Sequence, residues 1–366
     1  MYPQPICSSL DKFSVGALET ITHRMGGPPP RSAPGIELQS ASIVDLCGES
    51  LRLRGRPMTG RIPEDIVAAA MGESINSPGS FPSLLSAATG MVIDAADQYS
   101  PATYPNWARR LPSVPDFKAH TIWKATGQRE MPLHVDGQGF EQTTVAEQVG
   151  HIAVDEYGDE FTLTPRMVVD DALGGFGEAV KAKAESHAAT LNRLCVSLLV
   201  NNAVASDGIA LFDASRSNIR TPGGAPSESE LSAVRLLLRQ QTDPNGRVLG
   251  YSLARVLCPS ELETTVQKLL QATLQMTATT TADTQPFRGQ VAYDVEPILS
   301  ETSAARWFAF ASGGQGAIIY CHQTGYERMQ VRSYLDNATQ SLVFQFSGRF
   351  AAAVLSPGSA IRNDGG

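Results

Sequence analysis

Histidines are the first residues to inspect for catalysis, because imidazole is the commonest general base and metal ligand in proteins. The chain has six, and each stands alone in the sequence: His23, His120, His134, His151, His187 and His322. No GxSxG, HExxH, Walker-type or protein-kinase motif occurs in the 366 residues. Those patterns place a nucleophile, a zinc ion or a phosphate group at a fixed spacing. The sequence therefore predicts no catalytic, cofactor-binding or metal-binding residue, and a protein that is not an enzyme.

A run of four carboxylates offers one alternative, a cation site. It comprises Asp155, Glu156, Asp159 and Glu160, within a stretch predicted to be a strand. Oxygen-rich clusters suit hard cations, but acidic side chains are mostly exposed and solvated in folded proteins. We favour a solvated strand face over a cation site.

A glycine cluster offers another alternative, a phosphate-binding turn. Gly174, Gly175 and Gly177 lie near the start of a predicted helix, where backbone amides can bind an anion. Asp170 and Asp171 precede them and would repel that anion. We therefore expect the glycines to permit close packing of the helix against a neighbouring backbone.

Composition narrows the class of protein. With 42% hydrophobic and 18% charged residues, the chain should be globular, in two lobes. A net charge of −8 argues against tight nonspecific binding to DNA, which needs a concentrated basic surface. No apolar run is long enough to cross a bilayer and the N-terminal residues lack a signal pattern, so we expect a cytoplasmic protein. Five scattered cysteines without a CxxC pair predict reduced, buried thiols.

One long helix, from positions 170–171 to about 201, should organise the fold. Its apolar residues recur three or four positions apart, which is the spacing of one helical face. They are Leu173, Phe176, Val180, Ala184, Ala188, Leu191, Cys195 and Leu198. Asp170 and Asp171 are suited to cap its first turn. About thirty residues would make a rod of roughly 45 Å, so we expect a spine that spans a domain.

The segments before the spine are predicted to form an arm and a flap. Residues 1 to about 75 are rich in proline, glycine and serine, with helices at 43–55 and 63–73, and should be ordered by packing on something else. A helix begins near Phe81. Strands at 117–126 and 151–164 enclose a polar loop, 127–150, and form an extended two-stranded flap. An isolated hairpin is marginally stable in water, so the flap implies a partner surface.

The segments after the spine complete an α+β architecture. Helices are predicted at 228–241 and after Pro259, where Ser260 and Glu263 form a capping pattern, and residues 277–284 are predicted to be a flexible polar loop. Strands dominate from residue 290 to 360. The order of elements lacks the βαβ alternation that predicts a doubly wound sheet.

Five stretches in this order resemble the major capsid proteins of tailed bacteriophages, with the Hong Kong 97-type fold. They are similar to the capsid half of prohead-protease/major-capsid fusions and to Mu-like head subunits. The stretches are FPSLLSAATGMVIDAADQYSPATYPNWARRLPSVPDFKAH, TTVAEQVGHIAVDEYGDEFTLTP, RMVVDDALGGF, LLVNNAVASDGIALFDASRSN and ARVLCPSELETTVQKLL. FDASRSN departs from the family's usual FHxxHGN-like form.

The resemblance implies an organisation into an arm, an extended loop, and peripheral and axial lobes. The expected segments are an N-terminal arm at 1–100, peripheral segments at 101–126, 151–203 and 301–348, an extended loop at 127–150, and axial segments at 204–300 and 349–366.

The resemblance also implies a function and a set of partners. The chain should self-assemble as hexamers and pentamers into an icosahedral shell that encloses double-stranded DNA without sequence-specific binding. Its partners should be further copies, a portal, a scaffolding or maturation protease, and decoration proteins, with no membrane. It should reside in the virion after assembly in the bacterial host cytoplasm. The alternative is an encapsulin-like nanocompartment shell that encloses cargo enzymes.

Some capsids of this fold join subunits by a lysine–asparagine isopeptide bond, with the lysine on the flap. Here Lys118 and Lys124 precede the flap, and residues 125–180 contain no lysine. Arginine cannot replace lysine as the nucleophile, because its guanidinium stays protonated. We therefore expect a shell without this bond, even where an asparagine such as Asn337 is available.

Overall fold

The structure is a computed structural model. It describes residues 9–56, 62–73, 77, 79–97, 102–126, 133, 146–170, 172–243, 245–271, 274–277, 280–284, 286–312, 316–336, 338–339 and 341–365. The chain forms two compact units. The first unit comprises residues 1–101, 156–189 and 325–349, and the second comprises 102–155, 190–324 and 350–366.

The first unit combines five N-terminal helices with the start of the spine and three strand segments. Its elements are α1 (Leu10–Arg24), α2 (Ala33–Leu38), α3 (Ile43–Leu53), α4 (Pro63–Met71), α5 (Phe81–Asp97), β4 (Asp155–Leu163), α7 (Pro165–Val169), the first part of α8 (Leu173–Val200), β12 (Gln330–Asp336) and the first part of β13 (Ser341–Val354). β12 pairs antiparallel with β13 over the whole of its length, and β4 also pairs with β13.

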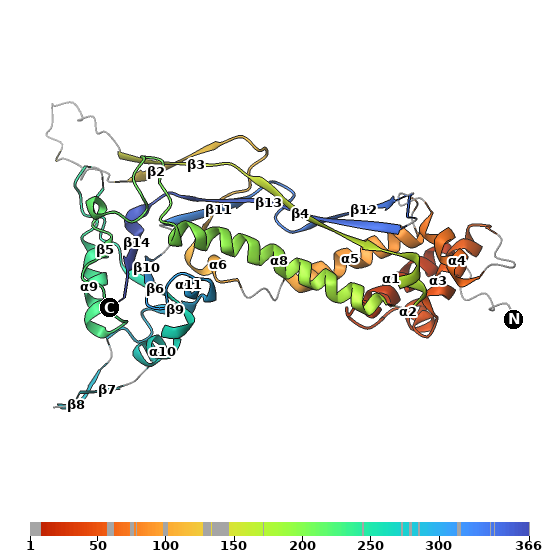
Figure 1. Cartoon of the computed structure of the whole chain (residues 1–366), viewed down its shortest axis with the longest axis horizontal. Coiled ribbons are helices and arrows are strands. Elements are labelled where there is room, and N and C mark those ends of the chain that lie inside the picture. The colour runs from red at the N-terminus through yellow and green to blue at the C-terminus, as the bar shows by residue number, and fades with distance from the viewer. Residues whose placement is uncertain are drawn as a thin grey trace. The chain divides into compact units, whose positions relative to one another are not determined.

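One apolar core holds the first unit together. Phe13 and Ile21 from α1 and Leu46 from α3 are buried in it, together with Phe176 from α8 and Phe344 from β13. Ring pairs extend this packing, since the centroid of Phe176 lies 4.9 Å from that of Phe344. The expectation that residues 1–75 lack a packed core is therefore wrong. Their helices bury their apolar faces within the chain itself (Figure 1).

The long spine helix is confirmed as α8, with 28 residues and a length of about 42 Å. Seven of the eight predicted stripe residues are buried, and Leu199 replaces Leu198 at the end of the stripe. Asp170 does not cap α8. It ends the short helix α7, which the sequence did not predict, and Asp171 lies outside the described residues.

The second unit contains most of the strands. Its elements are α6 (Tyr104–Trp107), β1 (Arg109–Arg110), β2 (His120–Thr126), β3 (Ala146–Ile152), the rest of α8, the 3-10 turn η1 (Ala214–Arg216), β5 (Ile219–Arg220), α9 (Glu228–Arg239), β6 (Leu253–Cys258), η2 (Ser260–Leu262), α10 (Glu263–Gln271), β7 (Leu274–Thr277), β8 (Thr280–Thr284), β9 (Ala292–Val295), α11 (Pro297–Ser300), β10 (Trp307–Ala311), β11 (Ile318–His322), the rest of β13, η3 (Pro357–Ser359) and β14 (Ala360–Asn363).

A mixed sheet in the order β5-β14-β10-β6-β9 forms the body of this unit. A core that contains Trp307, Val256 and Ile361 from the sheet also takes in Val234 from α9 and Val266 from α10. Elsewhere in the unit, β11 pairs antiparallel with the end of β13 and parallel with β1. A smaller core lies there, with Ile319, Ile152 and Leu355 among its members.

Several local predictions were wrong for reasons of pairing. The predicted strand 151–164 is two strands, because β3 pairs with β2 while β4 pairs with β13. Residues 277–284 do not form a loop, since β7 and β8 pair antiparallel. β6 pairs parallel with β9 after the intervening α10, so one β–α–β crossover does occur. Ser260 makes no side-chain cap, because η2 begins there with Pro259 at its N-cap.

The α+β class is confirmed, with helices and strands in both units. The peripheral and axial lobes stay predictions, and the two compact units divide the chain at other positions. Cys47, Cys195, Cys258 and Cys321 are free and buried, as predicted for packing residues. Among the described residues, no helix has the length and apolar character needed to cross a membrane.

Candidate functional site: the loop after the spine helix and the base of the hairpin

The loop that follows α8 contains the largest group of connected polar residues near a cleft. It begins where Asn202, with φ of 50°, ends the helix in the left-handed region that asparagine tolerates better than most residues. Asp207 and Gly208 form its tip, and Gly208 also has a positive φ, of 78°. Val204 and Ala210 form a bridge that closes this tip.

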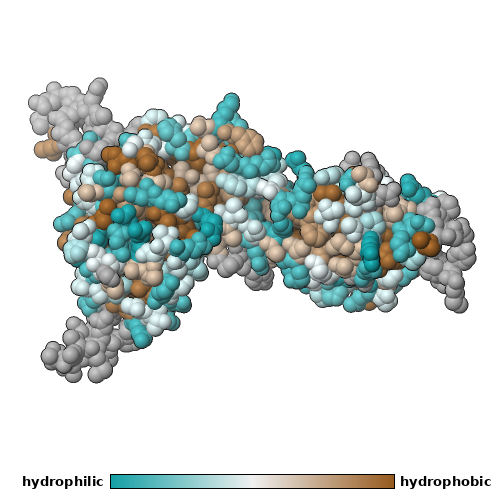
Figure 2. Space-filling view, in the orientation of Figure 1, coloured by the Kyte–Doolittle hydropathy of each residue, from teal (hydrophilic) through white to brown (hydrophobic). Residues whose placement is uncertain are grey.

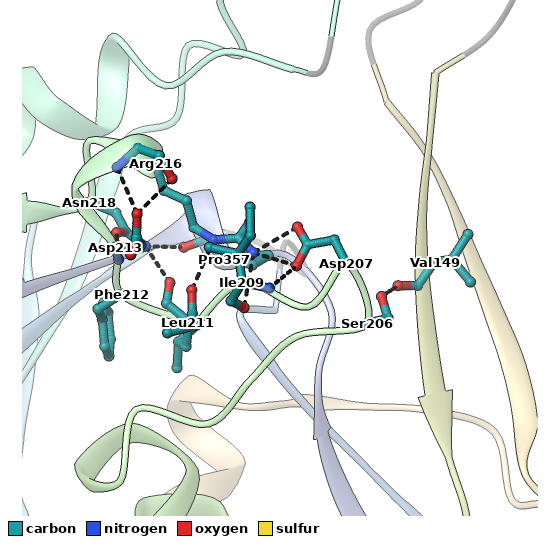
Figure 3. Close-up of polar contacts among 12 residues, drawn as sticks. Val149, Ser206, Asp207, Ile209, Leu211, Phe212, Asp213, Arg216, Asn218 and Pro357 are labelled. Carbon is teal, nitrogen blue, oxygen red and sulfur yellow. Dashed lines mark hydrogen bonds and ion pairs between the residues drawn. The ribbon is translucent and has the colours of Figure 1, made fainter.

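Two asparagines fix the path of the loop. The Asn202 amide accepts from the backbone N–H of Phe212 at 2.7 Å and donates to its carbonyl at 2.9 Å. Asn218, which is fully buried, accepts from Asp213 N at 3.0 Å and donates to Leu211 O at 2.7 Å (Figure 3). These side chains satisfy backbone groups that no strand or helix pairs, and leaving such groups unpaired in a buried site would be costly.

The acidic side chains of the loop are likewise engaged. Arg216 Nη2 lies 2.6 and 2.7 Å from the two carboxylate oxygens of Asp207, and Arg216 Nε donates to Ala210 O at 2.9 Å (Figure 3). Asp213 accepts from the hydroxyl and the backbone N–H of Ser215, and these hydrogen bonds lower the pKa of Asp213. The carboxylates therefore shape the loop.

A cleft of about 570 Å³ lies beside this loop. Its lining includes Asp207, Arg216, Gln241, Asp243 and Tyr251. Gln241 donates to Ser217 O, and Asp243 accepts from the backbone N–H groups of its own turn. Among the described lining residues there is no histidine or cysteine, so they offer no base next to a nucleophile. The arrangement supports a fixed surface and no recognisable reaction.

The base of the β2–β3 hairpin lies next to this loop. The hairpin is in register from His120 opposite Ile152 to Thr126 opposite Ala146. Ser206 Oγ donates to the carbonyl of Val149 in β3, which joins the loop to the hairpin (Figure 3). Gly150 packs so closely that a Cβ there would lie 2.9 Å from Leu355 Cδ1. The hairpin base is therefore held against the body of its unit.

Lys124 reinforces this attachment. Its Nζ donates to Ser356 Oγ at 2.8 Å, and Ser356 Oγ donates to Gln148 Oε1 at 2.9 Å. The same ammonium lies 5.9 Å from the ring centroid of Tyr251. Burial, with a smaller contribution from the charge of Arg109, lowers the pKa of Lys124 to about 8. Sequence reasoning did not identify this role, because it depends on residues more than a hundred positions away.

A model of the phage capsid protein family matches residues 148–363, which is more than half of the chain and includes the whole loop. The chain belongs to the phage capsid protein family. It is a capsid shell protein, and the resemblance seen in the sequence is confirmed. No curated protein matches the sequence.

Solved structures similar to the capsid protein include two phage capsids and one encapsulin. The procapsid of bacteriophage JBD30 is 15% identical over 78% of this chain and 76% of that chain, with a TM-score of 0.42. The capsid of Myoviridae phage XM1 is 16% identical over 69% and 89%, with a TM-score of 0.41. The SrpI encapsulin of Synechococcus elongatus is 10% identical over 72% and 87%, with a TM-score of 0.43. The assignment rests on the family match, because similarity at this level carries no functional argument.

The acidic run of the capsid protein lies along β4, and three of its four carboxylates have partners in the first unit. Asp159 pairs with Lys183, which lowers the pKa of Asp159. Glu156 pairs with Arg349 at 3.0 Å, and Glu160 accepts from Gln345. Among the described residues, no group of histidine, cysteine or acidic residues could hold a metal ion. A strand face with ion pairs therefore describes the run better than a cation site.

The glycine cluster serves helix packing, as predicted. A Cβ at Gly177 would overlap the carbonyl of Met25 at the end of α1, whereas one at Gly175 would meet nothing within 4 Å. His187 lies half-buried in α8, and His120 hydrogen-bonds Asp116 at 2.8 Å. Most of the predicted extended loop, 127–150, lies outside the described residues, as do His134 and Asn337.

Proposed function

We propose that this capsid shell protein is the major capsid protein of a tailed bacteriophage. In this proposal it assembles as hexamers and pentamers into an icosahedral shell around double-stranded DNA. The family match over residues 148–363 carries the proposal. The site geometry is consistent with it, because the polar side chains around the loop and the cleft hold the shape of a surface.

The charge of the chain bears on how such a shell would hold DNA. At −8, the protomer has no excess of basic groups with which to neutralise phosphates. We therefore infer that the shell confines the genome without gripping it and without reading its sequence. A portal, a scaffolding or maturation protease and decoration proteins are the proposed partners, in a virion assembled in the host cytoplasm.

Imaging of assembled particles tests the proposal. The chain is expressed in bacteria with and without its neighbouring phage genes, and sedimenting particles are examined by electron microscopy and mass measurement. The expected result is a closed shell with six-fold and five-fold clusters that, in the phage, protects DNA from nuclease. A small DNA-free shell that encloses protein would indicate the encapsulin-like alternative, and an absence of shells under all conditions would contradict both.

A further inference from the structure

The base of the β2–β3 hairpin presents an exposed face with a tryptophan at its centre. Thr121 lies opposite His151 and Trp123 lies opposite Val149 in the register. Because side chains alternate along a strand, these four residues share one face of the hairpin, and we call it the Trp123 face. Trp123 is 63% exposed, and apolar residues gather at the surface where Figure 1 draws β2 and β3 (Figure 2).

The opposite face of the hairpin is already in use. Ile122 and Ile152 pack there in the core that contains Leu355. Lys124, on the same side as Ile122, binds Ser356. The Trp123 face is therefore the side of the hairpin that the chain leaves uncovered, on a backbone that the body of the unit holds in place. A large, rigid, exposed aromatic group on a fixed backbone is typical of an interaction surface.

The neighbouring loop extends this exposed region. Ser206 bonds the carbonyl of Val149, and within three residues of Ser206 lie two exposed apolar side chains, Val204 and Ile209. The loop is held in shape by the contacts of its asparagines and arginine, so little ordering would be needed on association. Pre-ordered surfaces lose less entropy when they bind.

Charge indicates which partner fits this face. A chain with a net charge of −8 repels its own copies, and like charges brought together in an interface are costly. None of the four residues of the Trp123 face is acidic or basic, with histidine neutral. In the adjoining loop, Arg216 neutralises Asp207. The face also has no lysine or arginine to bind a nucleic-acid backbone, so a second copy of the chain suits it better than DNA.

We propose that the Trp123 face is a contact surface for a second copy of this chain, with Trp123 as its anchor. The proposal rests on the proposed function, because it requires that copies of the chain associate. It goes further by assigning one particular face of the hairpin to a neighbouring copy.

The tryptophan content of the chain supplies a direct test. There are three tryptophans, and Trp107 and Trp307 are buried at 6% and 0% exposure. Iodide quenching of dispersed protomers should therefore report Trp123. In sedimented assemblies of the unmodified chain, we expect the quenchable fraction to fall at least fivefold. Trp123→Phe, which removes the reporter and keeps an aromatic ring, should give little quenching in either state.

Variants test the energetic role of the anchor. Trp123→Ala should raise the protein concentration needed for half-maximal assembly tenfold or more, while circular dichroism and thermal melting of the protomer stay unchanged. Leu236→Ala is the matched control, because Leu236 is also exposed in the same unit, on α9. The control should change the assembly concentration less than twofold. An equal shift in both variants would contradict a specific role for Trp123.

The outcomes separate this inference from the proposed function. If shells form and Trp123 remains as quenchable as in protomers, the inference fails and the proposed function stands. If the chain stays monomeric with Trp123 quenchable, both fail. Protection of Trp123 in shells, together with the selective effect of Trp123→Ala, supports the inference.

Discussion

Lys124 illustrates how a single residue can link pH to stability in the hairpin base. Its ammonium is half-buried beside Ser356 and Tyr251, and its pKa is lowered to about 8 from an ordinary value of 10.5. Between these two values the unfolded chain holds a proton that the folded chain has released. Stability from this group therefore rises as pH increases from about 8 toward 10.

We expect Lys124→Met to remove this dependence. The difference between the urea midpoints of variant and parent should be largest in favour of the variant near pH 7.5, where the parent buries a charge. It should shrink by pH 9.5, where the parent has lost much of that charge. Lys124→Arg is the matched control, because its guanidinium stays charged and should keep the protein less stable at both values. A midpoint difference that does not change with pH would contradict the buried position of Lys124.

At the scale of elements, the close contact between α8 and the end of α1 gives a paired prediction. Gly177→Ala would push a methyl group into the backbone of Met25, so it should destabilise the first unit by about 1–3 kcal/mol. Gly175→Ala meets nothing within 4 Å and replaces glycine in an exposed helix position, so it should stabilise by about 0.5–1 kcal/mol. Thermal melting of both variants checks the opposite signs, and two shifts of the same sign would refute this packing.

The same elements show what the sequence could predict. The stripe of α8 was predictable because burial on one side of a helix imposes a period, and residues from Leu173 to Cys195 carry it. The helix α1 was missed, because it is short and precedes a segment rich in glycine and proline. The division of 151–164 into β3 and β4 depends on distant partners, β2 and β13, which local pattern cannot reveal.

The candidate site was less predictable than the fold. The turn at Asp207 and Gly208 is a local signal, and the stretch that contains it carried part of the family resemblance. The roles of Asn202 and Asn218 depend on which backbone groups of the folded loop lack partners, and that is known only once the path of the loop is known.

At the scale of the whole molecule, we expect the assembled shell to be held together without covalent bonds between chains. Residues 125–180 contain no lysine, and the amine of Lys124 is engaged with Ser356 within its own chain. Particles boiled in detergent with reductant should give one band near 39.1 kDa. A ladder of multimers that survives reduction would show that some other pair of side chains joins the subunits.

The buried cysteines have a practical consequence for chemical labelling. Burial raises the pKa of Cys258 to about 12 and that of Cys321 to about 11, and it raises the pKa values of Cys47 and Cys195 as well. Since the thiolate is the form that reacts with maleimides, these four sites should stay unmodified in the folded chain. With Cys7 replaced by serine, a cysteine introduced at an exposed position would act as a single attachment point. Fluorophores or displayed peptides could then be placed at one defined address per subunit.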